Sequence, residues 1–329
     1  MAKTTVVIPN YNGIQYIEEC LRSLFMQTYQ DFAVIVVDNG STDWSKEKVL
    51  TDFPKAKLID LKENTGFCHA VNVGIEAAKT PYVLLLNNDT KVKDGFVLAL
   101  EHAMESHQDA AAVAAKMVTM EDETILDGAG DYYCALGWAF ALGKGKKADR
   151  FTRERKIFSA CGGAVLYRKI VLEKIGYFDE NHFAYLEDLD LSYRGRIHGY
   201  QNYYCPQAVV KHAGSGFSGS RYNEFKVNLS SKNSIYVIYK NMPLLQILLN
   251  LPLLILGFLV KIVFFAIKGL GKFYIRGLFK GISFCFTKEA RNHKVPFRFQ
   301  NLPAYCHIQL ELWVNIFIRF FGNNGNRPL

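Results

Sequence analysis

The sequence predicts an α/β fold in which helices flank a mostly parallel β-sheet. Short β-branched segments alternate with segments of helical hydrophobic spacing over roughly the first 215 residues. The segment 32–38 (FAVIVVD) is apolar on both faces, as expected of a strand inside a parallel sheet. With 329 residues, 50% of them hydrophobic and 21% charged, the chain is also long and apolar enough to bury a large core.

The expected elements follow one another in a regular order. Strands are predicted at 4–9, 32–38, 57–61, 82–87, 113–118, 164–167 and 203–210. Helices are predicted at 14–27, at 67–78, at 94–107 and near 186–198. A further helix is predicted to follow the second strand, capped by Ser41 or Thr42. The segment 128–149, rich in glycine and aromatic residues, is expected to be irregular. This βαβα order is typical of a three-layer domain.

Polar residues cluster where the first four strands end. The clusters are 10–12 (NYN), 38–41 (DNGS), 64–66 (NTG) and 88–90 (NDT). Because the carboxyl ends of parallel strands share one edge, and open α/β sheets bind ligands there, the clusters predict a binding site. Each cluster alone is also compatible with an ordinary turn, since these residues favour turns. Four clusters on one edge favour the site.

Composition narrows the class of protein. The seven cysteines form no CxxC pair, which argues against a disulfide framework and against a zinc site built from cysteines. The start, MAKTTVVIPNYNG, lacks a secretory signal, so the active part is expected in the cytoplasm. Residues 240–329 carry a net charge of +10 and residues 1–239 carry −2. Because the basic region is also apolar, it indicates an anionic membrane surface as partner, and no nucleic acid.

Seven motifs occur in a characteristic order. They are VVIPNYNG (6–13), VVDNGSTD (36–43), NTGFCHAVNVGI (64–75), LLLNNDT (84–90), CGGAVLYRK (161–169), GYFDENHFAYLEDLDLSYR (176–194) and HAGSG (212–216). The set resembles glycosyltransferase family 2, and its last two motifs are similar to those of bacterial rhamnosyltransferases of surface-polysaccharide synthesis. The resemblance implies a GT-A fold with a Rossmann-like sheet. It also implies a catalytic domain at 1–239, with a nucleotide-sugar half at about 1–118 and an acceptor half at about 119–239.

The resemblance assigns residues to the nucleotide sugar. They are Pro9, Tyr11, Asn12, Asp38, Asn64, Gly66, Asn88, Asp89 and Arg221. The Asp38 carboxylate is expected to accept a hydrogen bond from the imide of uracil or thymine, between walls formed by Pro9 and Tyr11; its alternative role is a helix N-cap. Gly66 would allow a close backbone approach, or simply form a turn. Arg221 would donate to the diphosphate, or lie in a solvated loop.

Asn88 and Asp89 stand where the family carries its DxD motif, which holds a divalent cation on the diphosphate. Mg²⁺ or Mn²⁺ suits such oxygens. The first acid of the motif is Asn87 here, so Asp89 is the one strong ligand, and the metal is expected to arrive with the nucleotide sugar. The alternative is a strand-end turn. His212 is the second expected metal ligand, with a structural histidine as the alternative.

Glu187 and Asp188 are the expected catalytic residues. A sugar hydroxyl is a weak nucleophile, so transfer with inversion needs a carboxylate that takes its proton. The resemblance gives this role to Asp188, and Glu187 would bind acceptor hydroxyls or raise the pKa of Asp188. The alternative is a pair of helix-start acids facing the helix dipole. Asp190 and Arg194, four residues apart, are expected to form an ordinary helical ion pair.

The region 240–329 predicts membrane association. Its segment 244–267 has 24 residues, long enough to span, but contains Pro252 and several polar residues. A single span would carry the basic tail outside, against the positive-inside tendency. We therefore expect a helical hairpin, broken at Pro252, in the inner leaflet, with an amphipathic helix at 308–321. The alternative is a buried helix pair in a soluble homodimer.

Together these observations predict an inverting, metal-dependent glycosyltransferase at the cytoplasmic face of the bacterial cell membrane. The first expectation is transfer of L-rhamnose from dTDP-L-rhamnose to a lipid-linked saccharide in polysaccharide assembly. A donor carrying UDP is the alternative within the family. A nucleotidyltransferase is less favoured because PNYNG lacks the basic residues that a triphosphate loop needs. An inactive scaffold is disfavoured because Asp38, Asp89 and Asp188 are all present.

Overall fold

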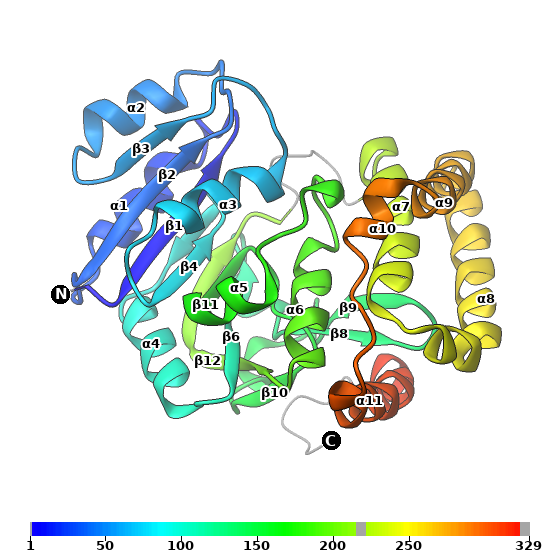
Figure 1. The fold of residues 1–329 in the computed structure, drawn as a ribbon. Coiled ribbons are helices and arrows are strands. Elements are labelled where there is room, and N and C mark those ends of the chain that lie inside the picture. The colour runs from blue at the N-terminus through cyan, green and yellow to red at the C-terminus, as the bar shows by residue number, and fades with distance from the viewer. Residues whose placement is uncertain (1, 215–221, 323–329) are drawn as a thin grey trace.

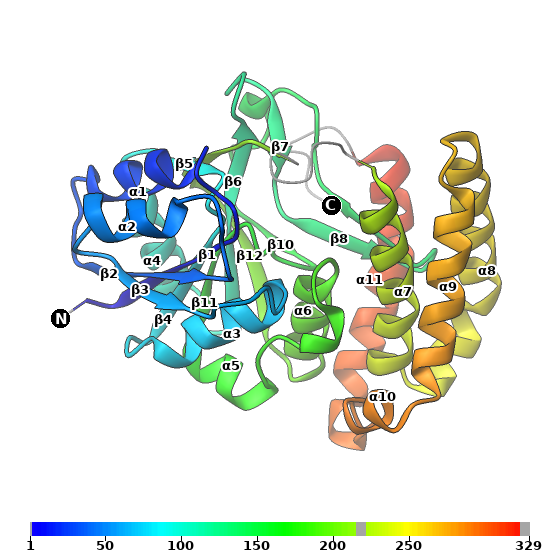
Figure 2. The same ribbon diagram turned by 90° about the horizontal axis from the view of Figure 1, so that it is seen from above.

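The computed structural model describes residues 2–214 and 222–322. An α/β body occupies the first two thirds of the chain, and a group of long helices lies against one end of it (Figure 1). Figure 2 shows the long helices α7, α8, α9 and α11 running side by side next to the body. Arg221, predicted to bind the diphosphate, lies outside the described residues.

A mixed sheet forms the centre of the body. Its strands are β1 (Thr4–Asn10), β2 (Phe32–Asp38), β3 (Lys57–Asp60), β4 (Tyr82–Leu86), β5 (Thr90–Val92), β6 (Ala110–Thr119), β7 (Leu126–Gly128), β10 (Arg155–Ile157), β11 (Ala164–Arg168) and β12 (Gln201–His212). The order is β10-β12-β6-β11-β4-β1-β2-β3, with β5 beside β12 and β7 beside β6. Strands β1, β2, β3, β4, β6 and β12 share one direction, and β11 runs against them. The core of the sheet is therefore mostly parallel, as predicted.

Helices cover both faces of the sheet. They are α1 (Ile17–Phe25), α2 (Ser45–Asp52), α3 (Phe67–Ala77), α4 (Phe96–Ser106), α5 (Lys169–Ile175) and α6 (Glu187–Ile197). Alternation along β1 shows the two faces: Val6 packs with α1 and α4, while Val7 packs with α3. Each strand thus buries side chains on both sides, which explains the continuous apolar runs in the sequence.

Two local expectations are wrong. The segment 128–149 is not irregular, because it contains an antiparallel hairpin of β8 (Asp131–Cys134) and β9 (Trp138–Ala141) and the 3-10 turn η1 (Ala148–Arg150). Neither Ser41 nor Thr42 caps α2, which begins at Ser45 after Trp44 in a left-handed conformation (φ 67°). Ser41 and Thr42 instead bond Asn12, through the Ser41 hydroxyl and the Thr42 amide.

The C-terminal elements are α7 (Glu224–Asn241), α8 (Leu244–Ile267), α9 (Gly271–Cys285), α10 (Lys288–Asn292), η3 (Phe299–Asn301) and α11 (Leu302–Phe321). The predicted break at Pro252 is wrong, since α8 continues through it. A proline removes one backbone hydrogen bond, and packing of α8 against the protein offsets that loss. The hairpin turns at 268–270 instead, where Gly269 has φ +73°. The boundary predicted after residue 239 falls inside α7.

Helix α8 turns its polar residues inward and its apolar residues outward. Gln246 accepts a hydrogen bond from Tyr193 at 2.8 Å, and Asn250 exchanges two with Gln309 at 2.9 and 2.8 Å. The opposite side exposes leucines such as Leu245 and Leu249. Within the described part of the chain, α8 is the one helix long and apolar enough to cross a membrane, with a mean hydropathy of 2.5.

Helix α11 repeats the inverted pattern. Gln309 and Asn315 are buried, and Leu310, Val314 and Phe317 are exposed. The helix is amphipathic as predicted, but its polar side faces the protein rather than water. A helix in water shows the opposite arrangement, so this pattern indicates that the outward face meets an apolar environment.

Candidate active site

A cavity of about 610 Å³ opens at the carboxyl ends of β1 and β4. Seven of the residues predicted from the sequence line it: Pro9, Tyr11, Asn64, Asn88, Asp89, Glu187 and Asp188. They come from four separate segments of the chain that the sheet topology brings to one edge. Asn12, Asp38, Gly66 and His212 lie beside this set without lining the cavity.

Asp38 is fully buried at the end of β2. Its two carboxylate oxygens accept hydrogen bonds from Asn10 Nδ2 at 2.8 Å and from the Ser41 amide at 2.9 Å. Asn10 in turn accepts a bond from Asn88 Nδ2 at 2.8 Å. Asp38 therefore organises the loops that follow β1 and β4. It is not the N-cap of α2, which starts seven residues later.

Gly66 has a positive φ of +91°, which favours glycine. A Cβ at this position would lie 2.6 Å from the Phe183 ring, so only glycine lets Phe183 approach. Asn64 supports the turn by accepting hydrogen bonds from the Gly66 amide at 3.0 Å and from Asn39 at 3.1 Å. The loop after β3 is thereby joined to the loop before α6.

Asp89 and His212 face each other because β5 pairs with the end of β12. His212 Nε2 lies 3.4 Å from Asp89 Oδ1, at the long end for a hydrogen bond, and this oxygen has no closer partner among the described residues. His212 Nδ1 contacts Asp127 Oδ2 at 2.9 Å. A carboxylate oxygen and an imidazole nitrogen, the latter oriented through its second nitrogen, fit a divalent cation.

The charges around His212 are strongly coupled. Burial lowers the pKa of His212, but hydrogen bonds and charges of Asp127 and Asp89 outweigh it and raise the pKa to about 9. Burial raises the pKa of Asp127, and its bonds to His212 and Lys144 outweigh this and lower it to about 2. In the metal-free protein the imidazole therefore carries a proton, which a bound cation would have to displace.

Asp188 and Glu187 begin α6 at the opposite side of the cavity. Asp188 accepts hydrogen bonds from the amides of Leu189 at 2.7 Å and Gly162 at 3.3 Å. Burial raises the pKa of Asp188 despite these bonds. Burial and the neighbouring Asp188 raise the pKa of Glu187, whose Oε2 is buried with no hydrogen-bond partner in the described residues. Both carboxyls thus hold a proton more tightly than they would in water, which suits groups that exchange a proton with a ligand.

Three non-glycine residues before α6 have positive φ angles: Phe183 (61°), Tyr185 (67°) and Leu186 (66°). Such conformations are strained and need support from the surroundings. Asn233 of α7 gives that support, because its amide donates to the carbonyls of His182, Ala184 and Tyr185 at 2.8–2.9 Å. Nothing in the local sequence indicated Asn233, which is fully buried.

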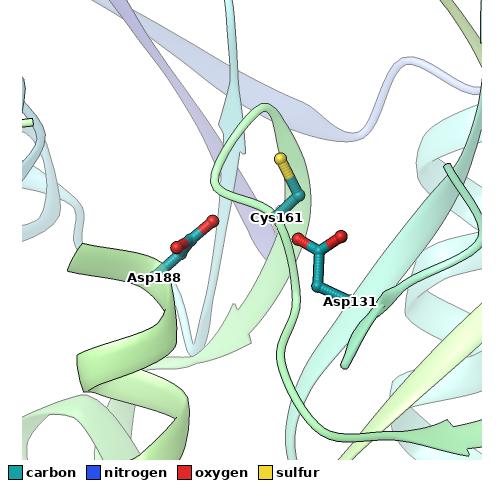
Figure 3. Close-up of side chains that lie close together, drawn as sticks. All are labelled: Asp131, Cys161 and Asp188. Atoms are coloured by element: carbon teal, nitrogen blue, oxygen red, sulfur yellow. The ribbon is translucent and has the colours of Figure 1, made fainter. Parts of the chain in front are cut away.

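Asp131 is the second residue that the sequence did not reveal. It begins β8, lines the cavity, and its carboxylate lies within 4.8 Å of those side-chain atoms of Cys161 and Asp188 that could bind a metal. Figure 3 shows the carboxyl groups of Asp131 and Asp188 on either side of Cys161. The one signal in the sequence was the glycine-rich run DGAGD at 127–131, which contains both Asp127 and Asp131.

The ion pair predicted between Asp190 and Arg194 is confirmed, at 3.0 Å. It belongs to a larger buried group outside the cavity. Lys240 Nζ lies 2.7 Å from Asp179 and 2.8 Å from Asp190. These charges connect α6 to α7 and hold the start of α6 in place.

The family follows from a match over residues 5–176 to the model described as "Glycosyl transferase family 2". The chain belongs to this family. It is 41% identical over 96 residues to a teichoic acid poly(glycerol phosphate) polymerase of Staphylococcus epidermidis, covering 28% of this chain and 13% of that protein. It is 27% identical over 230 residues to an N-acetylglucosaminyl-diphospho-decaprenol L-rhamnosyltransferase of Mycobacterium tuberculosis, covering 63% of this chain and 75% of that protein.

A solved structure supports the fold of this family member. The mannosyltransferase PcManGT from Pyrobaculum calidifontis, in complex with GDP-Man and Mn²⁺, superposes with a TM-score of 0.53 at 18% identity. The match covers 97% of this chain and 87% of that chain. At this identity the likeness concerns the fold alone. The GT-A architecture predicted for the glycosyltransferase from its motifs is confirmed.

Proposed function

We propose that the protein is an inverting glycosyltransferase that transfers L-rhamnose from dTDP-L-rhamnose to a lipid-linked saccharide in bacterial surface-polysaccharide assembly. One observation carries the proposal: Asp89 and Asp188 line the same cavity, one near His212 and the other at the start of α6. The first is suited to the diphosphate side and the second to the acceptor side. The name of the Mycobacterium tuberculosis relative supports rhamnose and a lipid diphosphate acceptor.

In this proposal the chemistry is a single displacement. The acceptor hydroxyl gives its proton to Asp188 while its oxygen bonds to the anomeric carbon, and the bond from that carbon to the diphosphate breaks. Attack opposite the leaving group inverts the anomeric centre. The raised pKa of Asp188 suits a base that must hold the proton after transfer. Glu187, which also lines the cavity, would bind acceptor hydroxyls.

Asp89 and His212 would hold Mg²⁺ or Mn²⁺ on the diphosphate, and Asp127 would orient the histidine. The cation would supply charge neutralisation to the leaving nucleoside diphosphate. Pro9 and Tyr11 line the cavity near Asp38, which supports a nucleotide base at that end. Asn12, Asn64, Gly66 and Asn88 would shape the loops around the nucleotide. A UDP-sugar donor is the alternative that the same residues support.

We propose that α8, α9 and α11 anchor the protein in the inner leaflet. The outward apolar faces of α8 and α11 support this, as do the exposed Lys268, Lys272, Arg276 and Lys280. Spanning is disfavoured because α8 contacts the body at both Gln246 and Gly257, where Trp138 donates to the Gly257 carbonyl at 3.0 Å. A helix held to a water-exposed body along that length cannot also cross a bilayer.

The decisive experiment combines a donor panel with one substitution. Thermal stabilisation by dTDP-L-rhamnose and by UDP-sugars, with Mg²⁺ or Mn²⁺, identifies the donor. Asp188→Asn should keep donor-induced stabilisation and lose roughly 10²–10⁴-fold in turnover, the range for a lost general base. Asp149→Asn, an exposed carboxyl in the same half, is the matched control and should retain turnover. Near-normal turnover in Asp188→Asn would refute the assignment.

A further inference from the structure

The carboxylate of Asp131 reaches the cavity from a rigid part of the backbone. Its backbone is fixed by hydrogen bonds of 2.9 Å in both directions with Ser159. Its side chain lines the cavity and, within the described residues, accepts no hydrogen bond from any side chain or amide. The side chain is half-buried, so water can reach its carboxylate in the free protein, and a ligand that enters the cavity would replace that water as hydrogen-bond donor.

The neighbours of Asp131 indicate what kind of ligand this part of the cavity suits. Asp188 and Cys161 lie within 4.8 Å. Burial raises the pKa of Cys161 well above its ordinary value, so its sulfur stays a protonated thiol, whereas a metal needs the thiolate. Glu187 lines the same cavity, and its Oε2 is buried with no hydrogen-bond partner among the described residues. Several carboxyl oxygens without donors suit a ligand that offers several hydroxyl groups.

We propose that Asp131 binds the acceptor by accepting a hydrogen bond from a hydroxyl next to the one that Asp188 deprotonates. The acceptor would then present two neighbouring hydroxyls to the Asp131–Asp188 pair, one as nucleophile and one as anchor. This inference rests on the proposed role of Asp188 and extends it to the choice of acceptor sugar. Asp131 forms no new bond to the sugar; the proton still moves to Asp188.

The carboxyl groups of Asp131 and Asp188 also affect each other's proton affinity. Burial and the adjacent Asp188 raise the pKa of Asp131. The other charged groups that act on Asp131 are Lys144, which lowers the pKa, and Asp127, which raises it. Two carboxylates this close oppose each other's ionisation, so removing one lets the other ionise at lower pH. An Asp131→Asn variant should therefore move the acid limb of the pH–rate profile to lower pH.

The binding test uses a short-chain analogue of an N-acetylglucosaminyl-diphospho-lipid and derivatives that each lack one ring hydroxyl. With wild-type protein, the derivative that lacks the nucleophilic hydroxyl should be inert. A second derivative, which lacks the neighbouring hydroxyl, should lose roughly 10- to 100-fold in kcat/KM, as for a lost hydrogen bond to a charged group. Asp131→Ala should lose the same factor on the parent acceptor and little more on the second derivative. If the loss from Asp131→Ala and the loss from the missing neighbouring hydroxyl multiply in full, the two groups do not interact and the proposal is overturned.

Controls separate this proposal from the general function. Asp149→Asn should leave both the pH profile and acceptor discrimination unchanged. Asp131→Ala should keep donor-induced thermal stabilisation, which shows that the variant is folded. If wild-type protein glycosylates none of the acceptors, the acceptor class proposed above is wrong. Asp131 is then tested on the slow transfer of the donor sugar to water. If Asp131→Asn does not move the acid limb of the pH–rate profile of that reaction, the coupling of Asp131 to Asp188 is overturned.

Discussion

Replacing Lys240 with methionine should strongly destabilise the protein. Lys240 is 3% exposed, and its ammonium group is shared between Asp179 and Asp190. Methionine keeps most of the aliphatic stem but removes the charge. Asp190 retains Arg194 and a hydrogen bond from Asn241 at 2.8 Å. Asp179 keeps hydrogen bonds from Tyr236 at 2.7 Å and Asn181 at 2.9 Å, and its one remaining cationic contact is with the half-exposed His293 at 3.3 Å among the described residues. Removing one partner of a buried ion pair costs about 3–5 kcal/mol in free energy of unfolding.

The loss should depend on pH in a defined direction. Burial raises the pKa values of Asp179 and Asp190, but Lys240 holds both well below their ordinary range, with help from Tyr236 at Asp179 and from Arg194 and His182 at Asp190. A carboxyl whose pKa is lowered by folding adds stability above its unfolded pKa, about 3.9, and loses it as the pH falls toward the folded value. The gap between wild type and Lys240→Met should therefore be largest near neutral pH and shrink below about pH 4.

Urea unfolding of detergent-solubilised protein, followed by tryptophan fluorescence between pH 3 and pH 7, measures this gap. The matched control is Lys280→Met on α9, an exposed lysine, which should change stability by no more than about 0.5 kcal/mol. The reasoning is refuted if Lys240→Met costs less than about 1 kcal/mol at pH 7, or if its cost is the same at pH 3.

Three further predictions concern the metal, the loop before α6 and the membrane. Asp89→Ala should abolish the extra donor-induced stabilisation that Mg²⁺ or Mn²⁺ gives the wild type, and wild-type activity that survives EDTA would contradict the metal role of Asp89 and His212. Asn233→Ala should misplace Asp188 and so lower kcat by up to roughly 10²-fold, while donor binding is retained. The control Asn228→Ala, which loses a hydrogen bond to Phe273, should leave kcat unchanged. The double variant Leu249→Glu with Leu256→Glu should leave anionic vesicles in a high-salt wash, whereas the control Leu50→Glu should stay bound. Retention of the double variant on the vesicles would contradict the leaflet model.

The sheet was predictable because its strands carry strong local signals. Strand β2 was predicted at its observed bounds, since its short apolar run is rich in β-branched residues and ends at Asp38, as expected of a buried strand. The hairpin of β8 and β9 was not, because each strand has four residues and the segment is rich in glycine. The course of α8 through Pro252 also escaped prediction. Whether a proline breaks a helix depends on tertiary packing that no local pattern contains.

The site divides in the same way. Asp89, Glu187 and Asp188 were found because they follow a strand or begin a helix within recognisable motifs. Asp131 and Asn233 were not, because their roles depend on contacts between distant segments. Asn233 bonds carbonyls 48 to 51 residues away, and the carboxylate of Asp131 meets Asp188 only after β8 is placed beside the segment around Ser159. Such roles come from topology, so one sequence without its fold does not reveal them.

The hairpin that carries Asp131 also connects the site to the membrane helices. Residues of β8 and β9 line the cavity, while the turn between them packs on α8, where a Cβ at Gly257 would lie 2.0 Å from the Leu136 carbonyl. The α11 carbonyl of Leu312 accepts a hydrogen bond from Ala135 at 2.9 Å, and α11 Asn315 donates to Tyr133 at 2.8 Å. The short β8–β9 hairpin therefore touches both the cavity and the membrane helices. An acceptor whose lipid lies in the leaflet beside α8 and α11 would meet the cavity first on its Asp131 side.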